Sequence, residues 1–201
     1  MYEIPTHIEV EEQSFAIRNQ GDYRMVLDCF SALQDKELSK EERIIASLLI
    51  FYEDFNDLED LEEVENLQIL VDKMLDFFNC GQPESPGMTM PYSLIDWEAD
   101  SQMICSAINN VAHKEIRFEP YIHWWTFMGY YQAVGESVLS TVVSIRNKIV
   151  KGKKLEKHEK EFRKENPQYF IWNRGEQEYT DEQQSIIDNW YKAGEDDATN
   201  C

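Results

Sequence analysis

Basic residues are scarce in this chain of 201 residues, which has 19 Lys and Arg against 39 Asp and Glu and a formal net charge of −20. A protein that wraps a nucleic-acid duplex must neutralise phosphates with Lys and Arg, so this balance argues against nucleic acid as a partner. A strongly negative charge favours solubility and selective contact with basic partners instead.

Glycine, proline and cysteine are also few, with eight, six and four copies. The low Gly and Pro content excludes a collagen-like or low-complexity chain. The cysteines form no C-x-x-C pair, so the sequence predicts neither a zinc site nor a disulfide framework. No apolar run approaches the roughly 18–20 residues of a membrane span, and Met1-Tyr2-Glu3 lacks the basic region of a signal peptide. We therefore expect a soluble cytoplasmic protein with no membrane partner.

Catalytic and cofactor motifs are missing as well. The chain has no P-loop, G-x-G-x-x-G, H-E-x-x-H or G-x-S-x-G string. Asp96, Glu98 and Asp100 alternate along an expected helix and so point in different directions, which favours an acidic first turn over a metal site. His123 is expected to be a hydrogen-bonded residue at a helix edge. The sequence thus predicts no enzyme, no cofactor and no metal.

Aromatic and aliphatic residues are plentiful, since 42% of the chain is hydrophobic and 12% aromatic. A chain of this length and composition can bury a stable core without disulfides. We predict a mainly α (α+β) fold, a single helical domain of about seven helices with a small N-terminal β-hairpin. The expected parts are the hairpin at 1–20, a helical domain at 21–170 with an internal loop at 81–91, and a tail at 171–201 with a short helix.

The hydrophobic period carries this prediction. Residues 6–10 and 14–18 alternate apolar with polar, as strands do, and after Gly21 the period becomes 3.6. Ser39 with Glu42, and Thr180 with Gln183, are capping boxes that open helices. Further helices are expected over Leu67–Phe78, over Leu94–Val111, over the aromatic block at 121–131 with Pro120 in its first turn, and from Val138 through Gly152 into a basic segment.

The charge is unevenly distributed. Residues 1–100 contain 24 acids and 6 bases, whereas residues 146–164 contain nine bases and three acids. We predict that this basic stripe and an acidic front bind partners, or one another within a molecule or between copies of the chain. Solvated helix faces remain the alternative. The predicted partner-binding residues are Arg146, Lys148, Lys151, Lys153, Lys154 and Lys157, with Glu59, Asp60, Glu62 and Glu63. Base stacking by Tyr169-Phe170-Ile171-Trp172 is the nucleic-acid alternative, and those aromatics also fit a tail packed on the helices.

Several strings together resemble a known family. They are Trp97–Phe118 (WEADSQMICSAINNVAHKEIRF), the box His123-Trp124-Trp125-Thr126-Phe127, the helix string Ile145-Arg146-Asn147-Lys148 with its Lys-rich continuation, and Gln20-Gly21-Asp22-Tyr23-Arg24. The chain resembles the gene-product-fifteen family of long-tailed phages and prophages of Gram-positive bacteria over about residues 5 to 170. The family usually has an Asp-Phe-Arg-like string where this chain has Asp22-Tyr23-Arg24.

This resemblance implies a tail assembly chaperone that binds and solubilises the tape-measure protein in the cytoplasm of the infected or lysogenic bacterial host. The implied partners are the tape-measure protein and other phage tail proteins, and a second copy of the chain is a further candidate partner. It brings no catalytic residues. A structural tail component, and a phage protein that interacts with or is sensed by a host defence protein, are the alternatives.

The core signature is Trp97, Trp124, Trp125 and Phe127. Helical spacing places Trp124, Phe127, Met128 and Tyr131 on the inner face of one helix, with Trp125 at its side.

Overall fold

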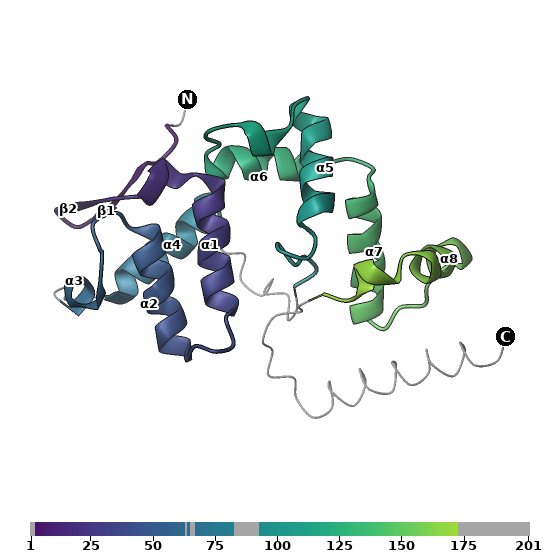
Figure 1. Cartoon of the computed structure of the whole chain (residues 1–201), viewed down its shortest axis with the longest axis horizontal. Helices are drawn as coiled ribbons and strands as arrows, with labels where there is room; N and C mark the ends of the chain where they lie inside the picture. The colour runs from purple at the N-terminus through teal and green to yellow at the C-terminus, as the bar shows by residue number, and fades with distance from the viewer. Residues whose placement is uncertain (1–2, 63, 65–66, 83–92, 173–201) are drawn as a thin grey trace. The chain divides into compact units, whose positions relative to one another are not determined.

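The computed structural model describes residues 3–62, 64, 67–82 and 93–172 (Figure 1). These residues form a two-stranded hairpin, eight α-helices and three short 3₁₀ helices. The expectation of a mostly helical fold with a small N-terminal hairpin is therefore confirmed. No helix in this part of the chain is both long and apolar enough to cross a membrane.

The hairpin pairs β1 (His7–Val10) with β2 (Gln13–Ala16) in antiparallel register, with Ile8 opposite Phe15. A 3₁₀ turn, η1 (Arg18–Gly21), leads from β2 into the first helix. Arg18 lies within it and donates to four carbonyl oxygens, those of Leu49, Ile50, Tyr52 and Phe55. These bonds fasten the end of the hairpin to the C-terminal end of the second helix. The two strands are thus held in place without a larger sheet.

The next helices follow the predicted period. They are α1 (Tyr23–Gln34), α2 (Lys40–Phe51) and α4 (Leu67–Phe78), and α2 opens with the predicted capping box of Ser39 and Glu42. A short helix, α3 (Leu58–Glu62), lies in the acidic segment, where no helix was expected. The α4 helix ends where predicted: Cys80 takes a left-handed φ of 57°, and the N–H of Gly81 donates to the carbonyl of Asp76.

Two expected helices begin later than predicted. The α5 helix spans Ser101–Ala112, because the preceding residues form a turn in which Asp96 accepts from the N–H groups of Glu98 and Ala99. The α6 helix spans Trp124–Gln132 and is capped by His123, so Pro120 lies outside it. The 3₁₀ helix η2 (Ile116–Phe118) occupies the connection between them.

The basic stripe does not form one continuous helix with the preceding residues. The α7 helix (Val138–Val150) is stopped by Gly152, two residues after its end, whose φ of 60° is left-handed, and the N–H of Lys153 donates to the carbonyl of Lys148. This bond and that from the N–H of Gly152 to the carbonyl of Ile149 make the Schellman ending that glycine favours. A separate helix, α8 (Lys157–Glu165), and η3 (Pro167–Phe170) follow.

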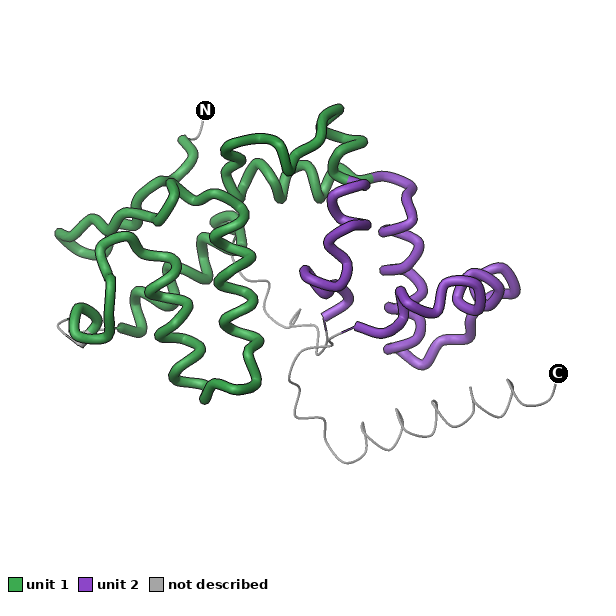
Figure 2. Tube along the Cα trace, in the orientation of Figure 1, with its two compact units in different colours: residues 1–89, 108–134 green, residues 90–107, 135–201 purple. Residues whose placement is uncertain are grey.

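The chain divides into two compact units (Figure 2). Unit 1 comprises residues 1–89 and 108–134, and unit 2 comprises residues 90–107 and 135–201, so that α5 contributes to both. The core of unit 1 is built largely from α1, α2, α4 and α6, and that of unit 2 from α5, α7 and Leu155. That the chain is a single domain with the predicted inner boundaries stays a prediction, and the predicted helix opened by Thr180 and Gln183 lies outside the described residues.

Candidate functional site

The paired tryptophans of the sequence signature complete the C-terminal end of α4. Trp124 donates its indole N–H to the carbonyl of Phe78, and Trp125 donates to the carbonyl of Phe77, each over 2.9 Å. The last carbonyls of a helix have no partner within it and need one from elsewhere when they are buried. The indole of Trp124 supplies such a partner to Phe78, and that of Trp125 adds a second donor to the carbonyl of Phe77, which also accepts from the N–H of Cys80. Both adjacent tryptophans therefore have a structural role.

Asp22 and His123 form a second junction in unit 1. Asp22 caps α1 by accepting from the N–H of Arg24, and its other carboxylate oxygen accepts from the N–H of Ile122 over 2.9 Å. His123 caps α6 by accepting from the N–H of Trp125 at Nδ1, and its Nε2 lies 3.0 Å from the carbonyl oxygen of Pro5. Nδ1 therefore carries no proton, and the Nε2–H donates to Pro5. Burial lowers the pKa of His123 more than the carbonyl of Pro5 and the charge of Asp22 raise it.

The aromatic signature residues are buried to different degrees. Trp124 and Phe127 are each 1% exposed and stack on one another, with ring centroids 5.6 Å apart. Trp125 is partly buried beside them, as are Met128 and Tyr131, and Trp97 is partly buried in unit 2. The block therefore packs most tightly through Trp124 and Phe127, and the other side chains of α6 are mostly partly buried.

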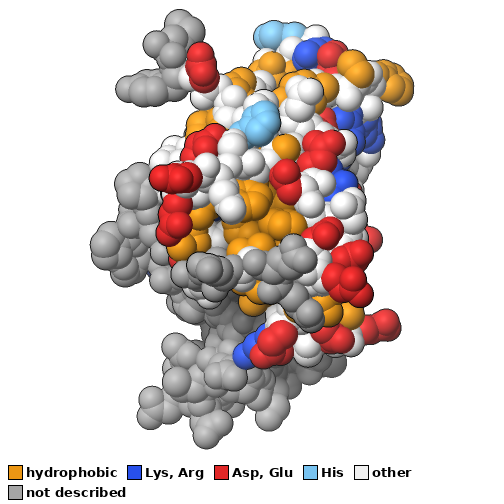
Figure 3. Space-filling view, turned by 90° about the vertical axis from the view of Figure 1, so that its left-hand side faces the viewer, with side chains coloured by type: hydrophobic (Ala, Val, Ile, Leu, Met, Phe, Trp, Pro, Cys, Tyr) orange, Lys and Arg blue, Asp and Glu red, His pale blue; other side chains and the backbone are white. Residues whose placement is uncertain are grey.

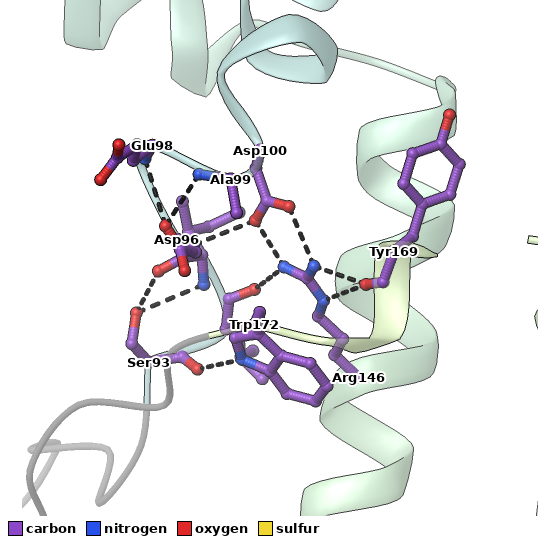
Figure 4. Close-up of polar contacts among 10 residues, drawn as sticks. Ser93, Asp96, Glu98, Ala99, Asp100, Arg146, Tyr169 and Trp172 are labelled. Atoms are coloured by element: carbon purple, nitrogen blue, oxygen red, sulfur yellow. Dashed lines mark hydrogen bonds and ion pairs between the residues drawn. The ribbon is translucent and has the colours of Figure 1, made fainter. Parts of the chain in front are cut away.

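Arg146 is the central polar residue of unit 2 (Figure 4). Its side chain is 1% exposed and forms an ion pair with Asp100, whose side chain is 2% exposed. Its remaining N–H groups donate to the carbonyls of Leu94 and Tyr169, so all five donors of the guanidinium have acceptors. The prediction that Arg146 is a partner-binding cation of the stripe is therefore wrong, because its side chain is buried and its charge is paired with Asp100 inside the unit.

Trp172 closes this cluster. Its ring lies under the guanidinium of Arg146, with Cζ 4.5 Å from the ring centroid, and its indole N–H donates to the carbonyl of Ser93 (Figure 4). Three segments that are distant in sequence, the turn before α5, the helix α7 and the residues after α8, are thus tied to one side chain. Asp100 does not join Asp96 in a metal site. Among the described residues no group of three or more His, Cys, Asp and Glu is placed to hold a metal ion.

The other cations of the basic stripe lie at the surface of unit 2. Lys151, Lys153 and Lys154 are exposed in the connection between α7 and α8. The side chain of Lys157 is 92% exposed, with Glu161 4.0 Å away. Lys148 is less available, because its ammonium group contacts Glu159 at 2.6 Å, which raises the pKa of Lys148 and lowers that of Glu159. The accessible stripe therefore begins at Lys151.

The acidic front lies in unit 1. Glu59 is exposed on α3, and Asp60 is partly exposed and accepts from the N–H of Asn56. Glu62 ends α3, and Glu63 lies outside the described residues. Figure 3 looks onto the side of the molecule where the hairpin and α3 lie: hydrophobic side chains gather near its middle, with Asp and Glu side chains around them. The segments 7–17 and 53–60, which contain the hairpin and the start of α3, have eight acids and no Lys or Arg.

Sequence reasoning missed the junctions that hold these elements together. Asp22 had a recognisable signal, because a short polar side chain directly before an apolar helical pattern is a helix cap. The pairing of Asp100 with Arg146 across 46 positions had none. The described signature residues are mostly engaged in caps, core packing and buried bonds, which leaves partner contact to other surfaces.

The comparisons with known proteins place these observations in one family. The family whose description is Bacteriophage Gp15 protein matches residues 2–170. The match includes the Asp-Tyr-Arg string, the Trp-Trp box, Asp100 and Arg146. No curated protein and no solved structure was found to match the chain.

Proposed function

Because the chain belongs to the bacteriophage Gp15 protein family, we propose that it is a tail assembly chaperone. In this role it binds the tape-measure protein during tail morphogenesis and keeps that protein soluble until the tail tube forms around it. The action takes place in the cytoplasm of the infected or lysogenic bacterial host. The observation that carries the proposal is the family match over residues 2–170.

The surface of the chain suits a protein that holds an apolar client. A net charge of −20 repels other acidic proteins and keeps a complex dispersed. On the side of the molecule where the hairpin and α3 lie, hydrophobic side chains surrounded by Asp and Glu can bind apolar segments with basic flanks. The proposal assigns no catalytic step and no cofactor, and it requires neither nucleic acid nor a membrane.

Self-association is the second part of the proposal. The exposed cations Lys151, Lys153, Lys154 and Lys157 on one copy complement Glu59 and Asp60 on another. Contacts between different patches of identical chains build open arrays, which suits the coating of a long client. Exposed ion pairs contribute about 0–1 kcal/mol each, so they would set the orientation of the copies, and apolar surface would supply most of the affinity.

Co-expression with the tape-measure protein of the same phage tests the proposal. We expect the tape-measure protein to move from the pellet to the soluble fraction and to co-purify with the tagged chain. An unrelated acidic helical protein of similar charge is the control, since charge alone can improve solubility. A tape-measure protein that stays insoluble with both would refute the chaperone role.

Analysis of purified phage particles separates the main alternative. A chaperone leaves before the tail is complete, whereas a structural tail component stays in the particle at fixed stoichiometry. Quantitative mass spectrometry of particles should therefore detect the major tail protein and not this chain. Co-purification of the chain with a host defence protein, without any effect on the tape-measure protein, would favour the host-directed alternative.

A further inference from the structure

Phe118 is the most exposed large apolar side chain in the described part of unit 1. It is 88% exposed and ends η2, in the connection between α5 and α6. Single exposed apolar residues are common on protein surfaces and usually need no explanation. Phe118 differs because the connection that carries it is fixed on both sides by hydrogen bonds.

The side toward α5 is held by Asn109. Its amide oxygen accepts from the N–H of Ile116 over 2.9 Å, and its amide nitrogen donates to Glu115 over 2.8 Å. Glu115 also caps η2 by accepting from the N–H of Arg117. Ile116 is 0% exposed and anchors the turn in the core, directly next to the outward-facing residues.

The side toward α6 is held by the first helix and the turn before it. Arg24 donates to the carbonyl of Glu119 over 2.8 Å, and the hydroxyl of Tyr121 donates to the carbonyl of Gln20 over 3.0 Å. Arg24 belongs to the Asp-Tyr-Arg string of the family resemblance. The backbone around Phe118 is thus ordered before any partner arrives, so binding loses less conformational entropy than it would with a loose loop.

The charges around Phe118 cancel. Lys114 pairs with Glu119 at 3.3 Å, and Arg117 pairs with Glu115 at 2.7 Å. Hydrogen bonds from Arg117, and to a smaller extent from Asn109, lower the pKa of Glu115 to about 2, so its pairing persists over the physiological pH range. A chain with a net charge of −20 therefore has a locally neutral rim around an exposed ring. Such a rim neither attracts a basic partner nor repels an acidic one.

We propose that Phe118, with the 43% exposed Tyr121 three residues further along the chain, is a preorganised knob that inserts into an apolar hole on a helical segment of the tape-measure protein. The inference rests on the proposed chaperone function and assigns one docking point for it. A convex ring needs a concave apolar site, and four side chains on one face of an apolar helix form such a hole. The neutral rim selects an uncharged, apolar partner surface. A second copy of this chain fits less well, since the surfaces proposed for self-association, Lys151 to Lys157 and Glu59 with Asp60, are charged, whereas the rim around Phe118 is neutral.

Substitution of Phe118 tests the knob directly, because a side chain with so little packing can change without loss of the fold. In co-expression with the tape-measure protein, Phe118→Asp should lower the amount of co-purified client at least about tenfold, the size expected for an interfacial hot spot. Ile171→Asp is the matched control, since Ile171 is 80% exposed and lies in unit 2. Both variants should retain the circular dichroism spectrum and melting temperature of the original chain.

Asn109→Ala tests preorganisation separately. It leaves Phe118 in place and removes two bonds from the connection, so it should weaken capture less than Phe118→Asp does. In a chain with Lys151, Lys153 and Lys154 reversed to Glu, which removes the charged stripe, the remaining capture through the knob should persist between 0.1 and 1 M salt, because a neutral rim has little charge to screen.

Photocrosslinking identifies the occupant. A benzoylphenylalanine in place of Phe118 should crosslink to the tape-measure protein at an apolar helical segment, located by mass spectrometry. Crosslinks mainly between two copies of the chain would overturn the assignment, as would full capture by Phe118→Asp. If the unsubstituted chain fails to solubilise the client, the proposed function fails and the knob fails with it. If that chain succeeds and Phe118→Asp equals it, only the knob is refuted.

Discussion

Asp100 accepts hydrogen bonds from both terminal nitrogens of Arg146, and neither side chain is more than 2% exposed. The planar guanidinium matches a carboxylate with two parallel bonds, which a lysine cannot do. Leu94 and Tyr169 accept the other bonds through their carbonyls, and Trp172 covers the guanidinium. Two residues separated by 46 positions thereby fix three segments of unit 2 (Figure 4).

Asp100→Asn should destabilise the protein strongly. The change keeps the shape of the side chain but leaves the buried charge of Arg146 without a counter-charge, which typically costs about 3–5 kcal/mol. Chemical denaturation followed by circular dichroism measures this difference in the free energy of unfolding. Lys151→Met, which removes an exposed charge, is the control and should change stability by less than about 0.5 kcal/mol. Equal stability of the two variants would show that the ion pair is unimportant.

Trp124→Ala should also cost about 3–5 kcal/mol, because it removes a buried ring and the bond to the carbonyl of Phe78. This is a large share of the stability of a typical domain. Trp125→Phe removes only the bond to the carbonyl of Phe77 and some partly exposed ring surface, so its cost should be nearer 1 kcal/mol. Thermal unfolding of both variants gives the comparison. If Trp124→Ala kept the melting temperature unchanged but lost partner binding, Trp124 would be a binding residue and its assignment to the core would be wrong.

Gly21→Ala should destabilise the junction between the hairpin and α1. Gly21 has a φ of 79°, and a β-carbon there would lie 2.8 Å from Phe77 Cζ and 2.9 Å from His123 Nε2. The left-handed backbone alone costs roughly 1–2 kcal/mol with a side chain present, and the contact with the rings adds to it. The matched variant is Gly152→Ala, which has a φ of 60° but no atom within 4 Å of the added carbon. Denaturation should rank Gly21→Ala as the more damaging of the two.

His123 should make stability depend on pH. Burial lowers its pKa in the folded state, so the neutral ring is favoured there, and the protonated ring loses the acceptor at Nδ1. Its stabilisation is therefore complete above the ordinary histidine pKa of about 6.5 and declines as the pH falls through the lower folded-state pKa.

The measurement is the free energy of unfolding between pH 5 and pH 8. His123→Asn keeps a capping side chain but cannot titrate, so this part of the pH dependence should flatten. His7→Asn, a change at an exposed histidine, should leave the profile as it is. A profile that His123→Asn does not alter would assign the dependence to other groups.

Reversal of Lys151, Lys153 and Lys154 to Glu should weaken self-association and capture of the tape-measure protein through the stripe. High salt should do the same, since the screening length falls from about 10 Å at 0.1 M to about 3 Å at 1 M. Sedimentation across this range detects the change. Reversal of Lys36, Lys40 and Lys73, which are exposed in unit 1, is the control of equal charge. If both triple variants behave alike, the stripe is only a solvated surface.

Much of the fold was predictable because it depends on neighbours in sequence. The hairpin, α1, α2, α4 and the end of α4 follow from hydrophobic period, the Ser39–Glu42 capping box and a glycine. The expected continuation beyond Gly152 was wrong for a local reason: the apolar and charged pattern persisted, but the left-handed glycine ended the helix. The late start of α5 reflects the turn in which Asp96 accepts from Glu98 and Ala99, and that of α6 reflects its cap by His123; both side chains compete with helical bonds.

The binding residues were less predictable, because charge in a sequence does not reveal exposure. Arg146 and Lys151 both counted toward the basic stripe, yet one is buried against Asp100 and the other is exposed. Phe118 is the opposite case. It lies in a string that resembles the family, and no sequence pattern indicated that its side chain is exposed to solvent. Only packing separates a residue that supports the fold from one that can meet a partner.

The sequence by itself determined the local elements, the strong negative charge and the family, because period, caps and composition act over a few residues. The tertiary structure alone decided which side chains are consumed internally, through the pairing of Asp100 with Arg146 and the capping of α4 by Trp124 and Trp125. The physical reason is that buried charges and helix-end carbonyls must find partners wherever the folded chain brings them. Those distant partners leave no periodic trace in the sequence.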